Sequence, residues 1–172
     1  MMSRISQCFA DAAAKNRAVL GVFVTAGDPD EAISAALLDS LVENGADFVE
    51  LGMPFSDPMA DGPAIQAASI RAIKAGMTLQ KTLDMAAAFR TRHPDTPLIL
   101  MGYFNPIYIY GQQAFITAAK DAGVDGLIIV DLPPEEDEEL CDAARDAGLS
   151  FIRLVTPTTL GSRVPVVVRK AG

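Results

Sequence analysis

The chain has 172 residues, of which 50% are hydrophobic and 21% are charged, and this balance is typical of a globular protein with one core. Its net charge of −8 argues against nucleic acid or an anionic membrane as a partner, because both repel an acidic surface. Cys8 and Cys141 are too few for a disulfide framework, which favours the reducing cytoplasm, and no apolar stretch is long enough to span a membrane.

Five short apolar segments rich in β-forming residues alternate with helical segments along the chain. They carry apolar residues on both faces, which is typical of a parallel sheet covered by helices. An amphipathic N-terminal helix that contains Ile5, Cys8, Phe9 and Ala12 precedes the first of them. The expected strands are Val19–Thr25, Phe48–Gly52, Leu98–Tyr103, Leu127–Asp131 and Phe151–Val155.

Capping residues mark the helices between these strands. We expect Asp28 to cap the helix after the first strand, with Pro29 at the first helical position and Glu31 at the third. The apolar stripe of this helix that faces the core is expected to be Ile33, Leu37 and Leu41. The next helix is expected to begin at Pro63, with Ile65, Ala68, Ala72 and Ile73 facing the core. Later helices are expected from Thr78 to about Arg92, over Gln112–Ala122 and from Pro133.

The last of these helices opens with the acidic run Glu135–Glu139. A run of carboxylates can bind a metal ion, but it also complements the positive end of the helix dipole. We interpret the run as a solvated helix start. With one histidine and two distant cysteines in the chain, we expect no metal site.

The helix exits repeat one pattern, in which a glycine ends the helix and the chain turns into a strand. It occurs at Gly45, Gly123 and Gly148, and the chain ends on the same signal at Gly172, with no strand after it. We therefore count about five strand–helix units and expect residues 1–172 to form a single incomplete domain. Strict alternation implies an α/β protein with a parallel sheet, either doubly wound or closed as an eight-stranded (β/α)8 barrel.

The positions of polar residues favour one of these two architectures over the other. Several of them fall at the carboxyl ends of different strands, where barrel enzymes build their sites. No glycine fingerprint of dinucleotide-binding proteins follows the first strand, which also favours the barrel. The polar residues in question are Thr25, Asp28, Glu50, Tyr103, Asn105, Asp131 and Thr156.

Glu50 stands out because it interrupts a strand that otherwise reads as buried. An ionised carboxylate there is unfavourable unless it has partners, so burial should raise its pKa. Such a group can donate and accept protons near neutral pH. The alternative is a structural glutamate tied to a neighbouring backbone or hydroxyl group.

Asp61 is a second candidate, on the loop from Met53 to Gly62. Its position before Gly62-Pro63 also suits a simple helix cap, so both readings remain open. The loop is long and carries two apolar residues that we expect to be exposed, Phe55 and Met59. A loop of this kind after a barrel strand is typical of one that covers a ligand or meets a partner.

The run GADFVELGMPFSDPMADGPAIQ, which spans both acids, closely resembles the signature of the tryptophan synthase alpha chain family. FVTAGDP, MGYFNPIYIYG and GLIIVDLPPEE resemble the same family, so the match extends over essentially the whole chain. The resemblance implies a TIM barrel that cleaves indole-3-glycerol phosphate to indole and glyceraldehyde 3-phosphate without a cofactor.

The same resemblance implies roles for individual residues. Glu50 matches the carboxylate that protonates the indole ring carbon and can serve the glycerol hydroxyl, and Asp61 matches the acid that holds the indole N–H. The positions that match the surroundings of the indole ring are Phe23, Tyr103, Val130 and Leu154.

The implied partner is the tryptophan synthase beta chain, in an α2β2 complex, and pyridoxal phosphate belongs to that partner. The matching contact segments are the loop from Pro54 to Asp61 and the region of Asn105. Family members continue for about another third of their length, which carries the phosphate-binding loops of the barrel. We therefore expect residues 1–172 alone to have little or no cleavage activity.

Two rival functions stay open at this point. The first is a non-catalytic protein that binds and activates a beta chain, and the second is another barrel lyase or isomerase that acts on a phosphorylated sugar. The paired acids and the loop motif favour the alpha-chain reaction over both.

Overall fold

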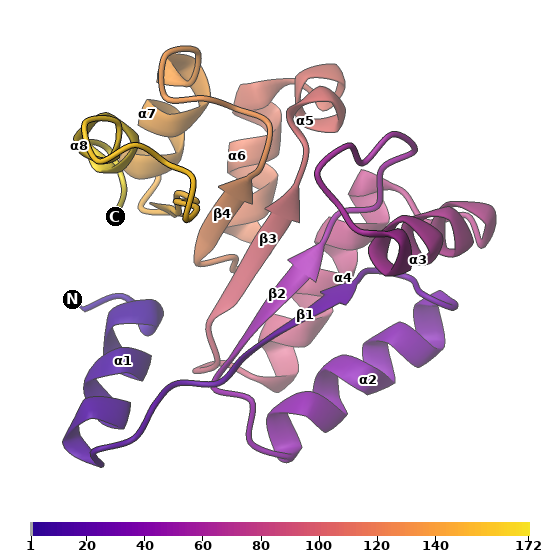
Figure 1. The fold of residues 1–172 in the computed structure, drawn as a ribbon. Coiled ribbons are helices and arrows are strands. Elements are labelled where there is room, and N and C mark those ends of the chain that lie inside the picture. Colours follow the sequence, from indigo (N-terminus) through magenta and orange to yellow (C-terminus); the bar gives the residue numbers. More distant parts are fainter. Residues whose placement is uncertain (1) are drawn as a thin grey trace.

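The computed structural model describes residues 2–172, which form one parallel β-sheet with helices packed mainly against one face (Figure 1). Neighbouring strands in the sheet follow the order of the chain, and every pair is parallel. A doubly wound sheet reverses its order at a switch point, whereas this one does not, so the predicted barrel-type winding is confirmed. The strands are β1 (Gly21–Thr25), β2 (Phe48–Gly52), β3 (Leu98–Gly102), β4 (Gly126–Ile129) and β5 (Ser150–Phe151).

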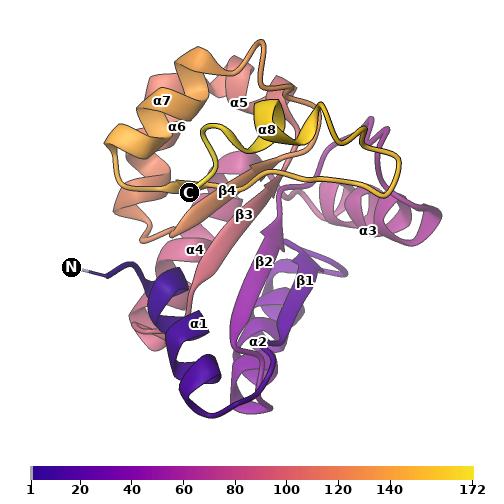
Figure 2. The ribbon, with the colours of Figure 1, turned by 60° about the vertical axis from the view of Figure 1, so that its left-hand side comes forward.

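Helices connect successive strands and cover the outer face of the sheet, while the N-terminal helix lies near the end at which the strands begin (Figure 2). No helix within residues 2–172 is long and apolar enough to cross a membrane. The helices are α1 (Arg4–Ala14), α2 (Glu31–Glu43), α3 (Pro63–Lys74), α4 (Leu79–Arg92), α5 (Phe104–Tyr110), α6 (Gln112–Asp121), α7 (Glu138–Asp146) and α8 (Val164–Val168).

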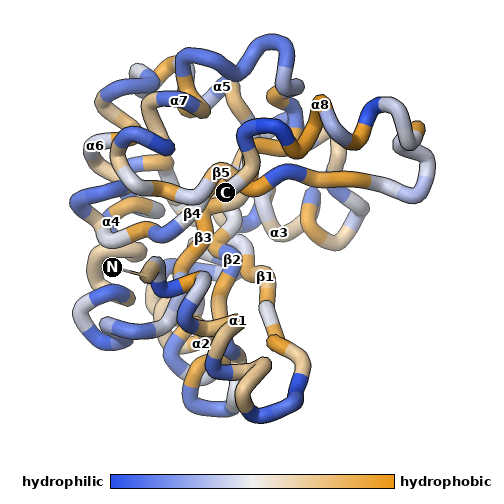
Figure 3. The backbone as a smooth tube through the Cα atoms, turned by 90° about the vertical axis from the view of Figure 1, so that its left-hand side faces the viewer, coloured by the Kyte–Doolittle hydropathy of each residue, from blue (hydrophilic) through white to orange (hydrophobic). Residues whose placement is uncertain are grey.

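The two faces of the sheet differ because side chains alternate along each strand. Val49 and Leu51 of β2 are fully buried in the core shared with the helices, as are their counterparts on β3 and β4. Phe48 and Glu50 point to the other face, which is the inner face of a barrel, and both are half-buried. Figure 3 shows the hydrophobic strands at the centre of the molecule, with polar segments around them.

The fifth strand is shorter than predicted. We expected Phe151–Val155, but β5 covers only Ser150–Phe151 and pairs with β4 at two positions. Leu154 and Val155 lie outside the strand and are 53% and 47% exposed. The last ladder bond on this strand runs from Ile152 N to the Leu127 carbonyl oxygen at 2.8 Å, and the next residue, Arg153, pairs with the buried Asp137, so the chain leaves the sheet there.

Two details of α2 differ from the prediction. Its N-cap is Asp30, whose side chain accepts a hydrogen bond from Ile33 N at 2.9 Å, and not Asp28. The buried face consists of Ser34 and Leu38, whereas Ile33 and Leu37 are exposed. A polar residue can lie in the core here because the Ser34 hydroxyl accepts from Gly27 N at 3.0 Å, a contact that hydrophobic periodicity does not reveal.

The prediction for α3 and α4 is more nearly right. Pro63 begins α3 and Thr78 caps α4, as expected, and Ala68 and Ala72 are buried. Ile73, however, is 39% exposed, so the inward stripe of α3 is narrower than the sequence pattern indicates.

The acidic run is the solvated helix start that we expected at four of its five positions, because its glutamates are exposed and Glu138 and Glu139 lie in the first turn of α7, whereas Asp137 is an exception. Helix α7 begins only at Glu138, and Asp137 is buried in an ion pair with Arg153, which follows β5. Glu135 pairs with Arg163, but this second pair lies at the surface. These arginines come from a segment later in the chain, so the charges that neutralise the run are not visible from its local sequence.

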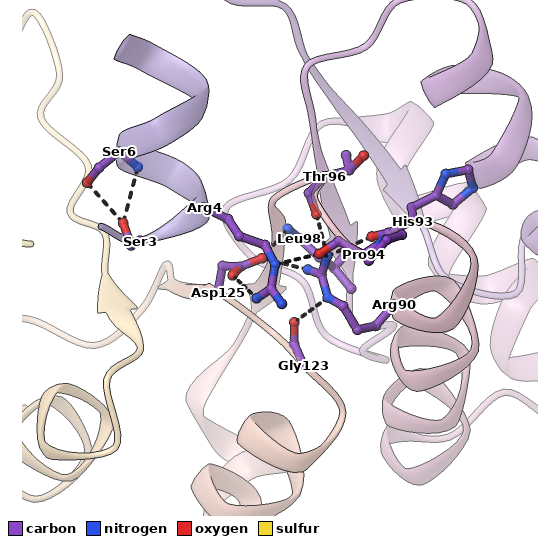
Figure 4. Close-up of polar contacts among 10 residues, drawn as sticks. All are labelled: Ser3, Arg4, Ser6, Arg90, His93, Pro94, Thr96, Leu98, Gly123 and Asp125. Atoms are coloured by element: carbon purple, nitrogen blue, oxygen red, sulfur yellow. Dashed lines mark hydrogen bonds and ion pairs between the residues drawn. The ribbon is translucent and has the colours of Figure 1, made fainter. Parts of the chain in front are cut away.

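A cluster of charges joins α1, α4, β3 and β4 at the ends where the strands begin (Figure 4). Asp125 accepts hydrogen bonds from Arg4 Nη1 at 2.9 Å, from Arg90 Nη2 at 2.7 Å and from Leu98 N at 2.9 Å. Arg90 also donates to four backbone carbonyls, among them that of Gly123 at 3.0 Å. A side chain at Gly123 would collide with Arg90, and this residue also has a φ of +75°.

We predict that Asp125→Asn lowers the free energy of unfolding by about 3 kcal/mol, because it leaves two guanidinium groups without their counter-charge and the Arg90 side chain is only 13% exposed. Urea titration of the variant beside the parent measures the difference. Asp142→Asn is the matched control, since Asp142 pairs with Lys170 at the surface and should lose less than about 1 kcal/mol. Equal losses in both variants would contradict the prediction.

Candidate active site

Glu50 lies on the inner face of the sheet, between Phe23 of β1 and Ile99 of β3 in the strand register. It is half-buried, and its carboxylate has no hydrogen-bond partner within residues 2–172. Burial raises the pKa of Glu50, as the sequence predicted, and no neighbouring charge opposes this shift. The structural alternative of a tethered glutamate therefore finds no support in the contacts of this side chain.

The loop that carries Asp61 is anchored on Tyr103, the residue after β3. The Tyr103 hydroxyl accepts a hydrogen bond from Ala60 N at 2.9 Å, and its ring packs on Phe55 with the centroids 5.3 Å apart. Phe55 is therefore half-buried and not exposed as expected, whereas Met59 is 78% exposed. From the sequence we placed Tyr103 at the end of a strand and near the ligand ring, but we missed the role of this residue as an anchor of the loop.

The protonation of Asp61 depends on two opposing effects. Burial raises the pKa of Asp61, and the adjacent Tyr103 hydroxyl partly offsets this by hydrogen bonding to the charged form. The pKa of Tyr103 is itself raised, chiefly by burial. Asp61 does not cap α3, because the N-cap of that helix is Gly62 and makes no side-chain hydrogen bond.

A bidentate ion pair holds the helix that follows this loop. Arg71 of α3 donates from Nε and Nη2 to the two carboxylate oxygens of Asp28, at 2.7 and 2.8 Å. This bidentate pair joins α3, which follows Asp61 directly, to the loop after β1. The sequence offered Asp28 as a helix cap, so the acid was noticed but its partner was missed.

Four of the six predicted site residues meet in one cleft at the carboxyl ends of β1 to β4. They are Phe23, Asp61, Tyr103 and Val130. The cleft is narrow, with a free volume of about 10 Å³, roughly the room of one water molecule. An aromatic ligand is too large for this volume. It therefore requires an outward shift of the loop that carries Asp61, or it lies beside the cleft on the inner face of the sheet.

The other two predicted residues lie next to this cleft. Glu50 precedes Gly52 of the cleft lining by two positions on the same strand, so both face the inner side of the sheet. Leu154 lines a neighbouring cavity of about 310 Å³, which shares Val130 with the cleft. Residues that the cleft adds to the predicted set are Thr25, Met53, Ile65, Ser69 and Met101.

This arrangement suits proton transfer on a small, partly apolar molecule. One carboxylate, with a raised pKa, is held on β2, and a second lies on the anchored loop that follows this strand. Within the part of the chain that the structure describes, no group of three or more histidine, cysteine or acidic side chains is placed to hold a metal ion.

Comparison with known families gives a match over nearly the whole chain. The family model described as tryptophan synthase alpha chain matches residues 9–172. Among solved structures, the alpha chain of Legionella pneumophila subsp. pneumophila is 41% identical, with a TM-score of 0.94. The match covers 100% of this chain and 64% of the Legionella chain, so the present chain spans less than two thirds of that relative's length.

Two further structures show the same likeness in assembled enzymes. A chain of the tryptophan synthase α2β2 complex of Pyrococcus furiosus is 40% identical, with a TM-score of 0.84 over 89% of this chain and 64% of that one. A chain of the tryptophan synthase of Mycobacterium tuberculosis is 34% identical, with a TM-score of 0.94 over 99% of this chain and 66% of that one.

We predict that Glu50→Gln raises the free energy of unfolding at neutral pH. Burial places the pKa of folded Glu50 above its unfolded value, so the protonated form favours folding; that stability is full below the unfolded pKa and is lost as pH rises through the folded pKa. The neutral amide avoids the loss, and the gain should vanish below about pH 4, the ordinary pKa of glutamic acid.

Urea titrations of parent and variant at both pH values measure this effect. Glu136→Gln is the matched control, because Glu136 is exposed and should give no gain at either pH. A variant that is no more stable than the parent at neutral pH would show that burying the ionised Glu50 carboxylate does not destabilise the fold.

Proposed function

Because the chain belongs to the family of tryptophan synthase alpha chains, we propose that the protein cleaves indole-3-glycerol phosphate to indole and glyceraldehyde 3-phosphate. The observation that carries this proposal is the pair of carboxylates, Glu50 on the inner face of β2 and Asp61 on the loop after that strand, at and beside a cleft at the carboxyl ends of a barrel-type sheet. Active sites of (β/α)8 barrels are built at this edge. The reaction needs no cofactor from this chain.

In this proposal Glu50 is the proton-transfer group. Its carboxylic acid protonates the indole ring carbon that carries the glycerol chain. The resulting carboxylate then takes the proton of the adjacent glycerol hydroxyl, whose electrons form the aldehyde carbonyl. The carbon–carbon bond breaks, and its electron pair returns to the ring and restores aromatic indole. A carboxyl group with a raised pKa suits both steps, because burial makes its protonated form more accessible than that of an ordinary glutamate.

Asp61 is the electrostatic group in the same proposal. It accepts the indole N–H and stabilises the positive charge that ring protonation creates. The contact with Tyr103 supports this role, since it opposes the effect of burial and favours the charged form of Asp61. Phe23, Tyr103, Val130 and Leu154 form the apolar walls for the ring, with Val130 shared between the two adjoining cavities.

We further propose that residues 1–172 form a single domain, an incomplete TIM barrel. A single hydrophobic cluster supports this, because it joins core residues of β2, β3, β4 and β5 to those of α2, α4, α6 and α7. The half-buried inner face of the sheet, with Phe48 and Ile152, is the side on which a barrel closes.

The partner that the surface supports best is the tryptophan synthase beta chain, in an α2β2 complex. The proposed contact segments, the loop from Pro54 to Asp61 and the region of Asn105, adjoin through the Tyr103 anchor. Their apolar side chains are unusually exposed: Met59 is 78% exposed, Tyr108 64% and Ile109 77%. Neighbouring exposed apolar residues of this size are typical of a surface that binds another protein.

We predict that Glu50→Gln and Asp61→Asn, each in a full-length alpha chain carrying these residues, abolish cleavage while leaving the fold intact. Removal of a general acid–base group costs about a hundredfold or more in kcat. Indole release from indole-3-glycerol phosphate measures the rate, and circular dichroism checks the fold.

Asp57→Asn is the matched control for this experiment, because it makes the same change at an exposed position of the same loop and should keep the parental rate. Normal turnover by Glu50→Gln or Asp61→Asn would remove the role assigned to that residue. Indole release by the parent separates the proposed reaction from that of a barrel enzyme acting on a phosphorylated sugar.

For the partner, we predict that Ile109→Glu weakens association with the beta chain at least tenfold, because it places a charge in the centre of an apolar contact. Titration calorimetry with purified beta chain measures the affinity. Ala87→Glu adds the same charge on an exposed part of α4 and should leave the affinity unchanged. Equal affinities for both variants would exclude α5 from the interface.

A further inference from the structure

We propose that Thr25 is a further substrate-binding residue, whose hydroxyl forms a hydrogen bond with a polar atom of the substrate in the cleft beside Asp61. The inference rests on the proposed function and adds a residue to which neither the family match nor the paired acids assign a role. Its basis is a buried hydroxyl without a partner inside a site that is otherwise assembled.

The Thr25 side chain is buried but unsatisfied. The residue is 5% exposed, and its Oγ1 has no hydrogen-bond partner within residues 2–172. Over the same range the only other buried side-chain atoms without a hydrogen bond belong to Asp137 and Arg153, and those two residues pair with each other. Among the described residues, Thr25 Oγ1 is therefore the one fully buried side-chain atom that has neither a hydrogen bond nor an ion-pair partner.

Other buried hydroxyls in the core show how such groups are normally accommodated. Ser34 accepts from Gly27 N at 3.0 Å, and Thr82 donates to the Thr78 carbonyl oxygen at 3.1 Å. A valine in place of Thr25 would have the same shape and the same preference for a strand, without a polar atom to desolvate. The hydroxyl thus does not stabilise the unliganded fold. A polar group of this kind is expected where a residue serves ligand binding.

The position of Thr25 directs its side chain to the ligand. It ends β1 and lines the cleft together with Asp61 and Tyr103. Its register partner on β2 is Gly52, so the adjoining strand offers no side chain to bond with it. A Cβ at Gly52 would lie 2.5 Å from the Phe23 ring, so a larger residue there would require this ring to shift.

The chemistry of a hydroxyl defines what it can recognise. Threonine can donate one hydrogen bond and accept others, so it suits a substrate hydroxyl or N–H that lies beside an apolar ring. In the proposed substrate these are the indole N–H and the glycerol hydroxyls. Asp61 and Thr25 would then contact the polar atoms, while Phe23 and Val130 contact the ring.

The test compares Thr25→Val, Thr25→Ser and the parent in a full-length alpha chain, with indole release and the thermal midpoint as the two readouts. We expect Thr25→Val to lower kcat/KM about ten- to a hundredfold, mainly through KM, because a polar atom of the bound substrate is left unpaired. Its Tm should equal or exceed that of the parent. Thr25→Ser, which keeps the hydroxyl, should retain most of the activity.

Thr82→Val is the matched control. It makes the same substitution at an equally buried threonine, whose hydroxyl is bonded within α4 and lies outside the cleft. We expect the opposite pattern from it, a lower Tm with an unchanged kcat/KM.

Two results would overturn the inference while leaving the proposed function in place. Cleavage by Thr25→Val at the parental rate would show that the hydroxyl does not contact the substrate. A fall in Tm like that of Thr82→Val would show that the hydroxyl has a partner within the fold and is structural. A parent that releases no indole would instead contradict the proposed function, and the inference with it.

Discussion

The alternation of side chains along β2 is the constraint on which the site depends. Val49 and Leu51 are fully buried against the helices, so the residue between them must face the other side of the sheet. A shift of register by one residue would place the Glu50 carboxylate in the apolar core and expose both aliphatic side chains, which is strongly unfavourable. Core packing therefore determines that Glu50 points to the inner face, and partial burial on that face raises the pKa of its carboxyl group.

Stability and chemistry are concentrated at opposite ends of the strands. Where the strands begin, Asp125 and Arg90 join two strands and two helices through a nearly buried ion pair (Figure 4). Where they end, Tyr103 holds the loop of Asp61, the Arg71–Asp28 pair joins α3 to the loop after β1, and the Thr25 hydroxyl in the cleft has no hydrogen-bond partner among the described residues. This division lets the site carry unfavourable features, two desolvated acids and an unpaired hydroxyl, while the other end of the sheet maintains the fold.

Predictions from the sequence succeeded where the deciding interactions are local. Thr78 caps α4 because its own side chain bonds the backbone of Lys81 three residues on, and such a cap can be read from the chain. They failed where a distant partner decides. Asp28 forms an ion pair with Arg71, and the buried Asp137 forms one with Arg153. Neither arginine is near enough in sequence for its partner to be inferred.

The sequence by itself determined the alternation of strands and helices, the parallel barrel-type sheet and the presence of polar residues at the carboxyl ends of its strands, because these follow from periodicity and capping within short segments. Only the tertiary structure decided which of those residues meet. It brought Phe23, Asp61, Tyr103 and Val130 to one cleft, left Leu154 in the next cavity, and turned Tyr103 into the anchor of a loop. The physical reason is that a contact between distant segments depends on register and packing of the whole sheet, which no local pattern contains.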